Sequence, residues 1–342
     1  MAQAAQLHAA HASGLSAVER ELQALHRARL RFGDEEHGIR LSVLTLVVAC
    51  IDTAGADAAA DVVMEISAEH PARALLLIAH RDAPSGIEAD LSLQCSTTRG
   101  SEQVCAEIVR LTVGGEAALH LNSVVAPLLV PDVPVQLWLH GAPDLNQALA
   151  PETLAICERV ILDTTAYPDA AKALRALAAI PRGPHGEIPV SDLTWARLTT
   201  WREVLARELD GPSRRAFLEG IERIAVRTGG AEGNGADALL FAGWLVDRLG
   251  VDVALDRPAD VAPGLGEAML DARSRDSRLQ VDINRDGDDL TTHVVLDGAV
   301  AGSRRVSNQP PRLAELVGAA LQQQGNDPVY AAALRSAVAL VR

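Results

Sequence analysis

Apolar residues recur along the first half of the chain at two different spacings. Residues 15–30 carry Leu and Val three or four positions apart, which predicts a leading amphipathic helix. The runs 39–51 and 72–80 are continuously apolar and rich in branched side chains, which is typical of strands covered on both faces. Residues 87–96 and 103–113 alternate apolar and polar positions around a glycine-containing turn, which predicts a hairpin.

The remaining elements of this half follow the same alternation of strands and helices. Two further strands are predicted at 133–140 and 160–163, and helices are predicted at 54–69, 116–130, 146–158 and 168–179. Strands alternating with helices around an internal hairpin predict an N-terminal α/β domain with a mixed sheet over residues 1–180.

A dense Pro/Gly stretch at 181–189 is the best candidate for a domain boundary. The pattern beyond it predicts a smaller C-terminal α+β domain over residues 181–342. Its helices are expected at 193–209, 238–249, 312–323 and 328–341, and its strands at 221–227, 251–255, 268–272, 277–284 and 290–297. Thr200 precedes Glu203 at capping-box spacing, so Thr200 is alternatively the cap of a separate helix.

Composition narrows the function class. The chain has 342 residues, 31 Lys and Arg against 45 Asp and Glu, and a formal net charge of −14. Without a long basic run, nothing in the sequence would displace the counterions of a nucleic acid, so a nucleic-acid partner is not expected. Only nine residues are aromatic (Trp 4, Tyr 2, Phe 3), so the core must be aliphatic.

No secretory signal is visible, and the longest apolar stretches are too short or too interrupted by proline to span a bilayer, so we expect a cytoplasmic protein with no membrane partner. The four cysteines, Cys50, Cys95, Cys105 and Cys157, form no CxxC pair, which disfavours structural zinc. They are expected to be buried thiols. A disulfide between Cys95 and Cys105, on adjacent predicted strands, is the alternative.

Three local patterns resemble ligand-binding motifs, but each lacks a residue that the motif needs. Residues 282–287 copy the start of an EF-hand loop, but position twelve is His293 instead of a carboxylate, so a hairpin turn is the better interpretation. Residues 229–235 form a glycine loop between a strand and a helix, without the Lys and Ser/Thr of a phosphate-binding loop. The glycines near residue 264 lack the third glycine of a dinucleotide site.

No catalytic constellation emerges from the sequence. His80, His140 and Asp163 each end a predicted strand, which is a common place for catalytic residues, but isolated strand-end groups are more often solvated or capping. We therefore expect no catalytic residues, no cofactor and no metal.

The tryptophans are the most distinctive feature. Trp195 and Trp201 lie beside Arg197 and Arg202 in one predicted helix, and Trp and Arg are the residues that most often dominate protein interfaces. These four residues are the candidate partner-binding site. The alternative is that both tryptophans pack between the two domains, and Trp138 and Trp244 are interpreted as core.

Several passages, taken in order, resemble the OpcA family, the glucose-6-phosphate dehydrogenase assembly proteins. The most specific are VVAPLLVPDVPVQLWLHG, which begins at Val124, and DLTWARLTTWREVL at 192–205; IRLSVLTLVV, HPARALLLIAH, QVCAEIVRL, VILD and ALLFAGWLVDRL accompany them. The match spans residues ~39–250.

The resemblance implies a non-catalytic assembly factor, or allosteric activator, that binds glucose-6-phosphate dehydrogenase and favours its active oligomer in the oxidative pentose phosphate pathway. One alternative is a sugar-phosphate or nucleotide-binding enzyme that uses the Gly229–Gly235 loop. A second is a self-assembling scaffold in which the Trp/Arg cluster forms a homodimer.

Overall fold

The computed structural model describes residues 5–33, 42–97, 103–180, 186–229, 235–257 and 264–341. The chain forms two compact units, each built from separate segments. Unit 1 consists of Met1–Asp163, Ile180–Ser191 and Arg312–Gly325; unit 2 consists of Thr164–Ala179, Asp192–Pro311 and Asn326–Arg342. The division of the chain into 1–180 and 181–342 stays a prediction.

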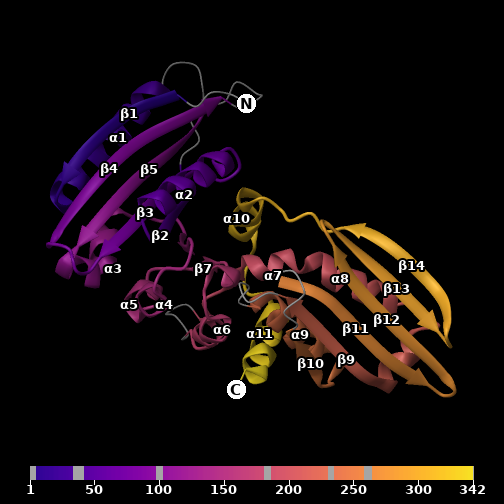
Figure 1. Cartoon of the computed structure of the whole chain (residues 1–342). Helices are drawn as coiled ribbons and strands as arrows, with labels where there is room; N and C mark the ends of the chain where they lie inside the picture. Colours follow the sequence, from indigo (N-terminus) through magenta and orange to yellow (C-terminus); the bar gives the residue numbers. More distant parts are fainter. Residues whose placement is uncertain are drawn as a thin grey trace. The chain divides into compact units, whose positions relative to one another are not determined.

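Unit 1 contains an eight-stranded mixed sheet (Figure 1). Four parallel strand pairings form the middle of the sheet, and the predicted antiparallel hairpin lies to one side of them. This mixed arrangement confirms the predicted α/β class. In spatial order the strands are β1 (Ala5–Ser13), β4 (Gly86–Thr97), β5 (Gln103–Gly114), β3 (Ala72–His80), β2 (Leu44–Cys50), β6 (Val135–Leu139), β7 (Arg159–Leu162) and β8 (Val190–Asp192).

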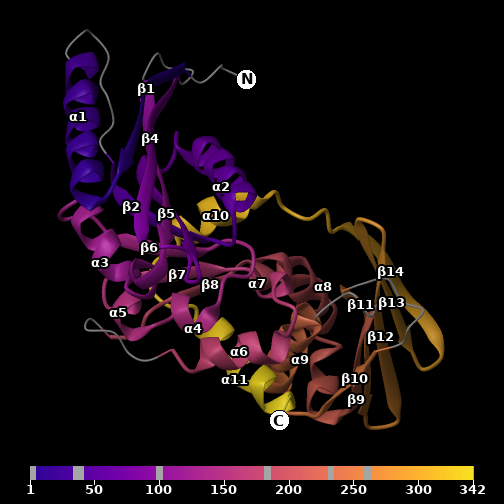
Figure 2. The same ribbon diagram turned by 60° about the vertical axis from the view of Figure 1, so that its left-hand side comes forward.

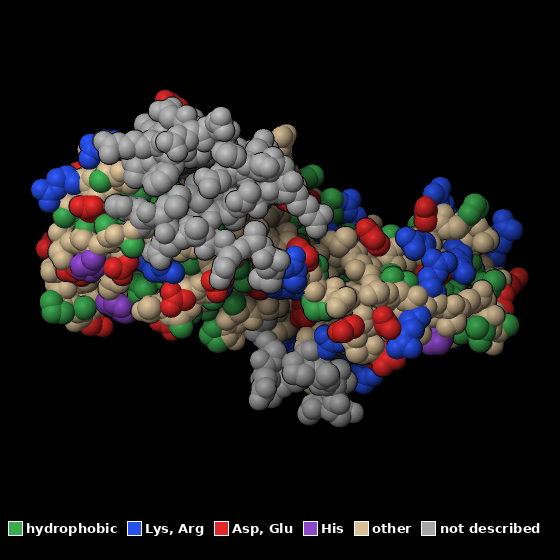
Figure 3. Space-filling model, turned by 90° about the horizontal axis from the view of Figure 1, so that it is seen from above, with side chains coloured by type: hydrophobic (Ala, Val, Ile, Leu, Met, Phe, Trp, Pro, Cys, Tyr) green, Lys and Arg blue, Asp and Glu red, His purple; other side chains and the backbone are tan. Residues whose placement is uncertain are grey.

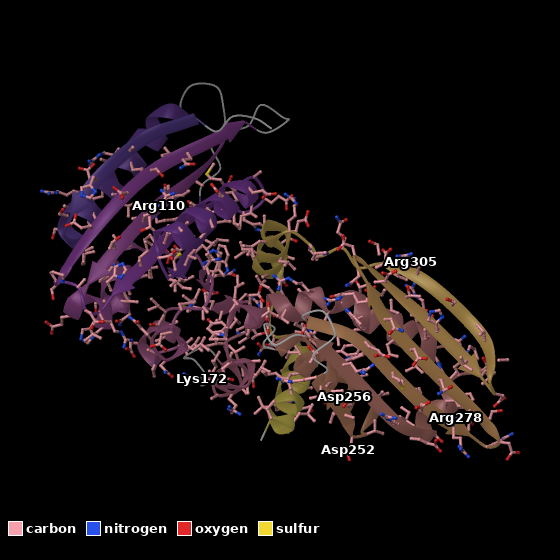
Figure 4. The ribbon with its side chains drawn as sticks, in the orientation of Figure 1. Arg110, Lys172, Asp252, Asp256, Arg278 and Arg305 are labelled. Atoms are coloured by element: carbon pink, nitrogen blue, oxygen red, sulfur yellow. The ribbon has the colours of Figure 1, made fainter. Side chains whose placement is uncertain are left out.

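Helices cover both faces of this sheet. The predicted leading helix is α1 (Leu15–Gly33), which packs against β1 and β4, and Figure 2 shows α2 (Thr53–Ile66) on the opposite side of the strands. Arg110 of β5, labelled in Figure 4, contacts Asp57 of α2 at 3.2 Å. Helix α10 (Leu313–Gln322) packs on α2, and its Gln322 amide contacts the His70 ring.

Two of the expected helices are wrong, because each segment is broken into shorter turns and a proline lies at one break in each. The segment 116–130 forms two 3₁₀ turns around the short α3 (Leu121–Val125), and Pro127 lies in the second turn. The segment 146–158 forms α4 (Leu145–Ala148) and α5 (Pro151–Leu154), because a proline lacks the amide hydrogen that a continuous helix needs.

Unit 2 contains a six-stranded sheet in which one parallel pair joins an antiparallel meander. The order is β10 (Val253–Asp256), β9 (Ile221–Gly229), β11 (Gly264–Ser274), β12 (Ser277–Asp286), β13 (Asp289–Leu296) and β14 (Ala299–Ser307). The sequence pattern does not predict β14, since this strand is exposed along most of its length and has no alternating apolar face. The tight turn at Gly287–Asp288 confirms the hairpin expected in place of an EF-hand.

The helices of unit 2 are α6 (Ala170–Ala178), α7 (Leu193–Arg197), α8 (Thr199–Leu209), α9 (Ala236–Leu249) and α11 (Pro328–Leu340), with a 3₁₀ turn at Arg215–Gly220. The α7–α8 break confirms a separate second helix, but Thr200 is not its cap, because α8 begins at Thr199 after the N-cap residue Leu198. α9 packs on β9, β10 and β11 and lies closely against α11. The shared core of these elements positions the predicted site residues.

Candidate partner-binding surface

The start of α7 is fixed by a buried carboxylate. Asp192 is 3% exposed, and its Oδ1 accepts from the Thr194 amide at 3.0 Å and from the Thr164 amide at 3.2 Å. Its Oδ2 accepts from the Thr164 hydroxyl at 2.9 Å and from the Tyr330 hydroxyl at 3.4 Å. Burial and then the nearby Asp192 raise the pKa of Tyr330 well above its ordinary value, so Tyr330 stays protonated as a donor.

Trp195 faces inward from α7. Its side chain is buried, and the indole Nε1 donates to Asp327 Oδ2 at 2.9 Å, while Oδ1 of the same carboxylate caps α11. The Arg202 guanidinium lies 3.6 Å from the centre of the Trp195 ring system and donates to the Trp195 carbonyl at 3.2 Å. The predicted Trp/Arg pair is therefore a cation–π stack within this chain.

Burial lowers the pKa of Arg202 to about 10, against smaller opposing effects of Asp327 and Glu203. Arg202 is therefore still charged at neutral pH. The guanidinium also bonds the Leu198 carbonyl and the Thr199 hydroxyl, at 3.4 and 3.0 Å. Arg202 thus ties the end of α7 to the first turn of α8 while remaining half-exposed.

Trp201 is 3% exposed and belongs to the core of unit 2. Its ring meets Phe241 of α9 edge-on, with the ring centres 5.8 Å apart. Trp195 and Trp201 are thus both buried, and both rings contact side chains of this chain. Whether the four predicted residues bind a partner stays a prediction.

Arg197 is half-buried and lines a cavity of about 380 Å³. The cavity is bounded by the first turn of α8, the β12–β13 turn and the segment 308–311. Charged groups of both signs line it, namely Arg197, Arg285, Asp237 and Asp288. Asp237 Oδ2 accepts from the Leu265 amide at 2.6 Å, so one of these carboxylates has a structural role.

Trp244 differs from its interpretation as core, because its side chain is half-exposed. It stacks on Phe241 with ring centres 5.5 Å apart and lines an open groove of about 430 Å³ between α8, the 3₁₀ turn at Arg215–Gly220 and α9. The signal that sequence reasoning missed is the arginine content around it, since Arg207, Arg215 and Arg248 all line the same groove.

The candidate catalytic groups of the sequence lie at the ends of three different strands. His80 ends β3 and is exposed, and His140 and Asp163 follow β6 and β7. The His140 ring lies 4.8 Å from the ring system of Trp138, and burial lowers its pKa, so it is neutral at pH 7. Among the described residues, no group of three or more His, Cys, Asp or Glu is placed to hold a metal ion.

The cysteines divide into two pairs. Cys50 and Cys157 are buried free thiols, as expected, and burial raises the pKa of each to about 12. The register of β4 and β5 places Cys95 opposite Cys105, but their side chains lie outside the described residues and the disulfide stays a prediction. Most of the Gly229–Gly235 loop also lies outside the described residues.

Family models match most of the chain. They are described as the N-terminal domain and the C-terminal domain of the glucose-6-phosphate dehydrogenase subunit, and they match residues 63–179 and 188–334, respectively. A protein of Nostoc punctiforme named "Putative OxPP cycle protein OpcA" is 32% identical over 187 residues, covering 54% of this chain and 39% of that protein. The Synechocystis protein of the same name is 28% identical over 186 residues, covering 54% and 38%.

The chain thus spans about two fifths of the length of these curated relatives. Two solved structures are also similar. Biliverdin reductase from Synechocystis is 10% identical with a TM-score of 0.39, and the alignment covers 88% of this chain and 98% of that one. An oxidoreductase from Sinorhizobium meliloti is 11% identical with a TM-score of 0.35, covering 88% and 89%. None of the described helices is long and apolar enough to cross a membrane.

Proposed function

This chain belongs to the OpcA family, and from that membership we propose that it is a non-catalytic partner of glucose-6-phosphate dehydrogenase. It binds the dehydrogenase in the cytoplasm and favours the active oligomer of that enzyme in the oxidative pentose phosphate pathway. The observation that carries the proposal is the pair of dehydrogenase-related domain models, which match residues 63–179 and 188–334.

The geometry supports a role in binding more than one in chemistry. Of the candidate catalytic groups, His140 is packed against Trp138, with its ring 4.8 Å from the tryptophan ring system. The Asp192 network and the Arg202 stack bond groups within unit 2, so they stabilise a fixed surface. A rigid surface is what selective binding to one state of a partner needs.

The mechanism is a shift of population. A partner that binds the active oligomer more tightly than the inactive form moves the equilibrium toward the active oligomer by that difference in affinity alone. A tenfold preference corresponds to about 1.4 kcal/mol. No group of this chain needs to contact the substrate of the dehydrogenase.

The four residues of the candidate partner-binding site have two different roles in this proposal. Trp195 and Trp201 act indirectly, because they are buried and hold α7 and α8 in place. Arg197 and Arg202 are half-buried and have an edge that a partner can reach. An Arg197→Glu variant that remains folded and binds the dehydrogenase with the wild-type Kd would remove Arg197 from the site.

Co-purification with the dehydrogenase of the same organism tests the proposal. We expect a stable complex, a larger dehydrogenase oligomer by light scattering, and higher activity at substrate levels below saturation. An unchanged oligomer and unchanged activity in the presence of excess chain would refute it. Turnover of a sugar phosphate by the isolated chain would instead favour an enzyme.

A further inference from the structure

We propose that the groove between α8 and α9 binds an acidic amphipathic helix of the dehydrogenase. We call this site the α8–α9 groove; it is lined by Leu205, Ala206, Arg207, Leu209, Asp210, Arg215, Leu218, Trp244, Leu245, Arg248 and Leu249. The inference rests on the proposed function, and it adds the surface and the chemistry of the segment that docks there.

The floor of the α8–α9 groove is apolar and only partly covered. Leu205, Leu209 and Leu245 are buried beneath it, whereas Trp244 is half-exposed and Leu218 is 37% exposed. A half-exposed Trp beside an exposed Leu leaves apolar area in water, which a partner covers favourably at roughly 25 cal/mol per Å². Trp is also the residue type most enriched among the dominant contacts of interfaces.

The rim of the groove is cationic. Three arginines, Arg207, Arg215 and Arg248, line it. Arg215 is paired with Asp210 and Arg248 with the neighbouring Asp247 at 3.6 Å, so the arginines outnumber the carboxylates by one and Arg207 supplies the excess charge. The whole chain has the opposite bias, with a net charge of −14. A local excess of positive charge in an otherwise acidic chain is complementary to carboxylates on the occupant, so it selects where on this chain an acidic segment docks.

The shape of the site favours a helix. Two helices and a 3₁₀ turn form its walls, and its volume of about 430 Å³ lies within the range of well-formed binding sites. An amphipathic helix places apolar side chains at i, i+3, i+4 and i+7 along such a groove, while its flanks remain free to carry Asp and Glu. The apolar floor and the arginine rim match these two parts of one helix.

A second copy of the chain fits the groove less well. The most exposed large apolar residue among those described is Val300, 76% exposed on β14. Its strand also carries Arg304 and Arg305, the latter paired with Asp286 and Asp289, and Figure 3 shows basic side chains gathered over this part of unit 2. Docking this strand in the groove would place Arg304 against the arginine rim, and such a contact of like charges is unfavourable.

Matched charge variants test the inference in the full-length chain. Leu218→Glu places a carboxylate on the floor, and Arg207→Glu combined with Arg248→Glu reverses the rim. The controls are Leu296→Glu on β13, where the leucine is 38% exposed, and Arg304→Glu on β14. We expect both groove variants to raise the Kd for the dehydrogenase at least tenfold and the controls to stay within twofold, with unchanged near-UV circular dichroism.

The outcomes separate the two proposals. If the wild-type chain does not bind the dehydrogenase, the proposed function fails; if it binds and the groove variants bind equally well, only the groove assignment fails. A larger loss in the controls would assign the interface to β13 and β14 instead. If Leu218→Glu splits a dimer of this chain without affecting dehydrogenase binding, a second copy occupies the groove.

Trp244 supplies a direct readout. Of the four tryptophans it is the one that is not fully buried, so docking of a helix on it should shift the fluorescence emission to the blue. Trp244→Phe should abolish that shift, and a shift that persists in this variant would place the contact elsewhere.

Discussion

At the scale of single residues, the chemistry of the chain is mostly that of buried polar groups with partners. Arg202 illustrates this, because its charge is held against the Trp195 ring system and three backbone or hydroxyl oxygens. The sequence correctly predicts that Trp195 and Arg202 lie near each other, with Trp201 next to Arg202 in the chain. It does not show whether such a Trp/Arg cluster faces the solvent or the core. That direction depends on Asp327 and Phe241, which are distant in sequence.

Arg202→Ala should lower the free energy of unfolding by about 1–2 kcal/mol, because a half-exposed cation–π contact lies between the exposed and the desolvated case. Arg207→Ala, on the same helix but exposed, should change it by less than about 0.5 kcal/mol. Urea unfolding of both variants measures the difference. Equal small effects would mean that the stack on Trp195 contributes nothing to stability.

His11 should make the attachment of β1 depend on pH. Its Nδ1 lies 2.9 Å from Asp90 and its Nε2 3.1 Å from Glu88, both on β4. The hydrogen bond to Asp90 is the main cause that raises the pKa of His11. The stabilisation is therefore full below the unfolded pKa of about 6.5 and is lost as pH rises through the folded pKa.

Hydrogen exchange of the β1 amides between pH 5.5 and 8.5, corrected for intrinsic rates, measures this dependence. Protection should fall with rising pH in the wild-type chain and stay nearly flat in His11→Gln. The same fall in both proteins would exclude His11 as its cause.

At the scale of elements, prediction succeeds where the apolar period is long. The continuous runs of β2 and β3, the alternating β4–β5 hairpin and the stripe of α1 all correspond to observed elements. Prediction fails in two kinds of segment. The expected helices at 116–130 and 146–158 contain prolines and are broken, and β14 is exposed, so it has no apolar pattern to detect. The pattern also misses β1, because its short Ala/His-rich segment pairs with β4, which is far away in sequence.

Close helix packing gives a test at this scale. A methyl group on Gly243 of α9 would lie 2.3 Å from the Ala333 carbonyl oxygen of α11, whereas on Gly318 of α10 its nearest neighbour is 3.7 Å away. Gly243→Ala should therefore destabilise the chain by about 1–3 kcal/mol. Gly318→Ala should be neutral or stabilising by up to about 1 kcal/mol, from helix propensity. The melting temperatures of the two variants check this: Gly243→Ala should melt below the wild-type chain, and Gly318→Ala should melt at the same temperature or above it. Equal melting temperatures of the two variants would contradict the close packing of α9 on α11.

At the scale of the whole molecule, the fold class and the family follow from the sequence, but the position of the α8–α9 groove does not. Its apolar floor comes from three separate segments, and each of them looks like ordinary core when considered alone. Trp244 is half-exposed, whereas the other three tryptophans are buried. This difference depends on tertiary packing, so the sequence alone does not reveal it.

The central proposal is that this chain changes the assembly of glucose-6-phosphate dehydrogenase without carrying out a reaction itself. The most direct test is the oligomeric state of glucose-6-phosphate dehydrogenase by sedimentation velocity, measured with and without an excess of the wild-type chain. The account predicts a shift to a larger, more active oligomer that contains this chain and is weakened by Leu218→Glu. A sedimentation profile that is the simple sum of the two separate proteins would contradict it.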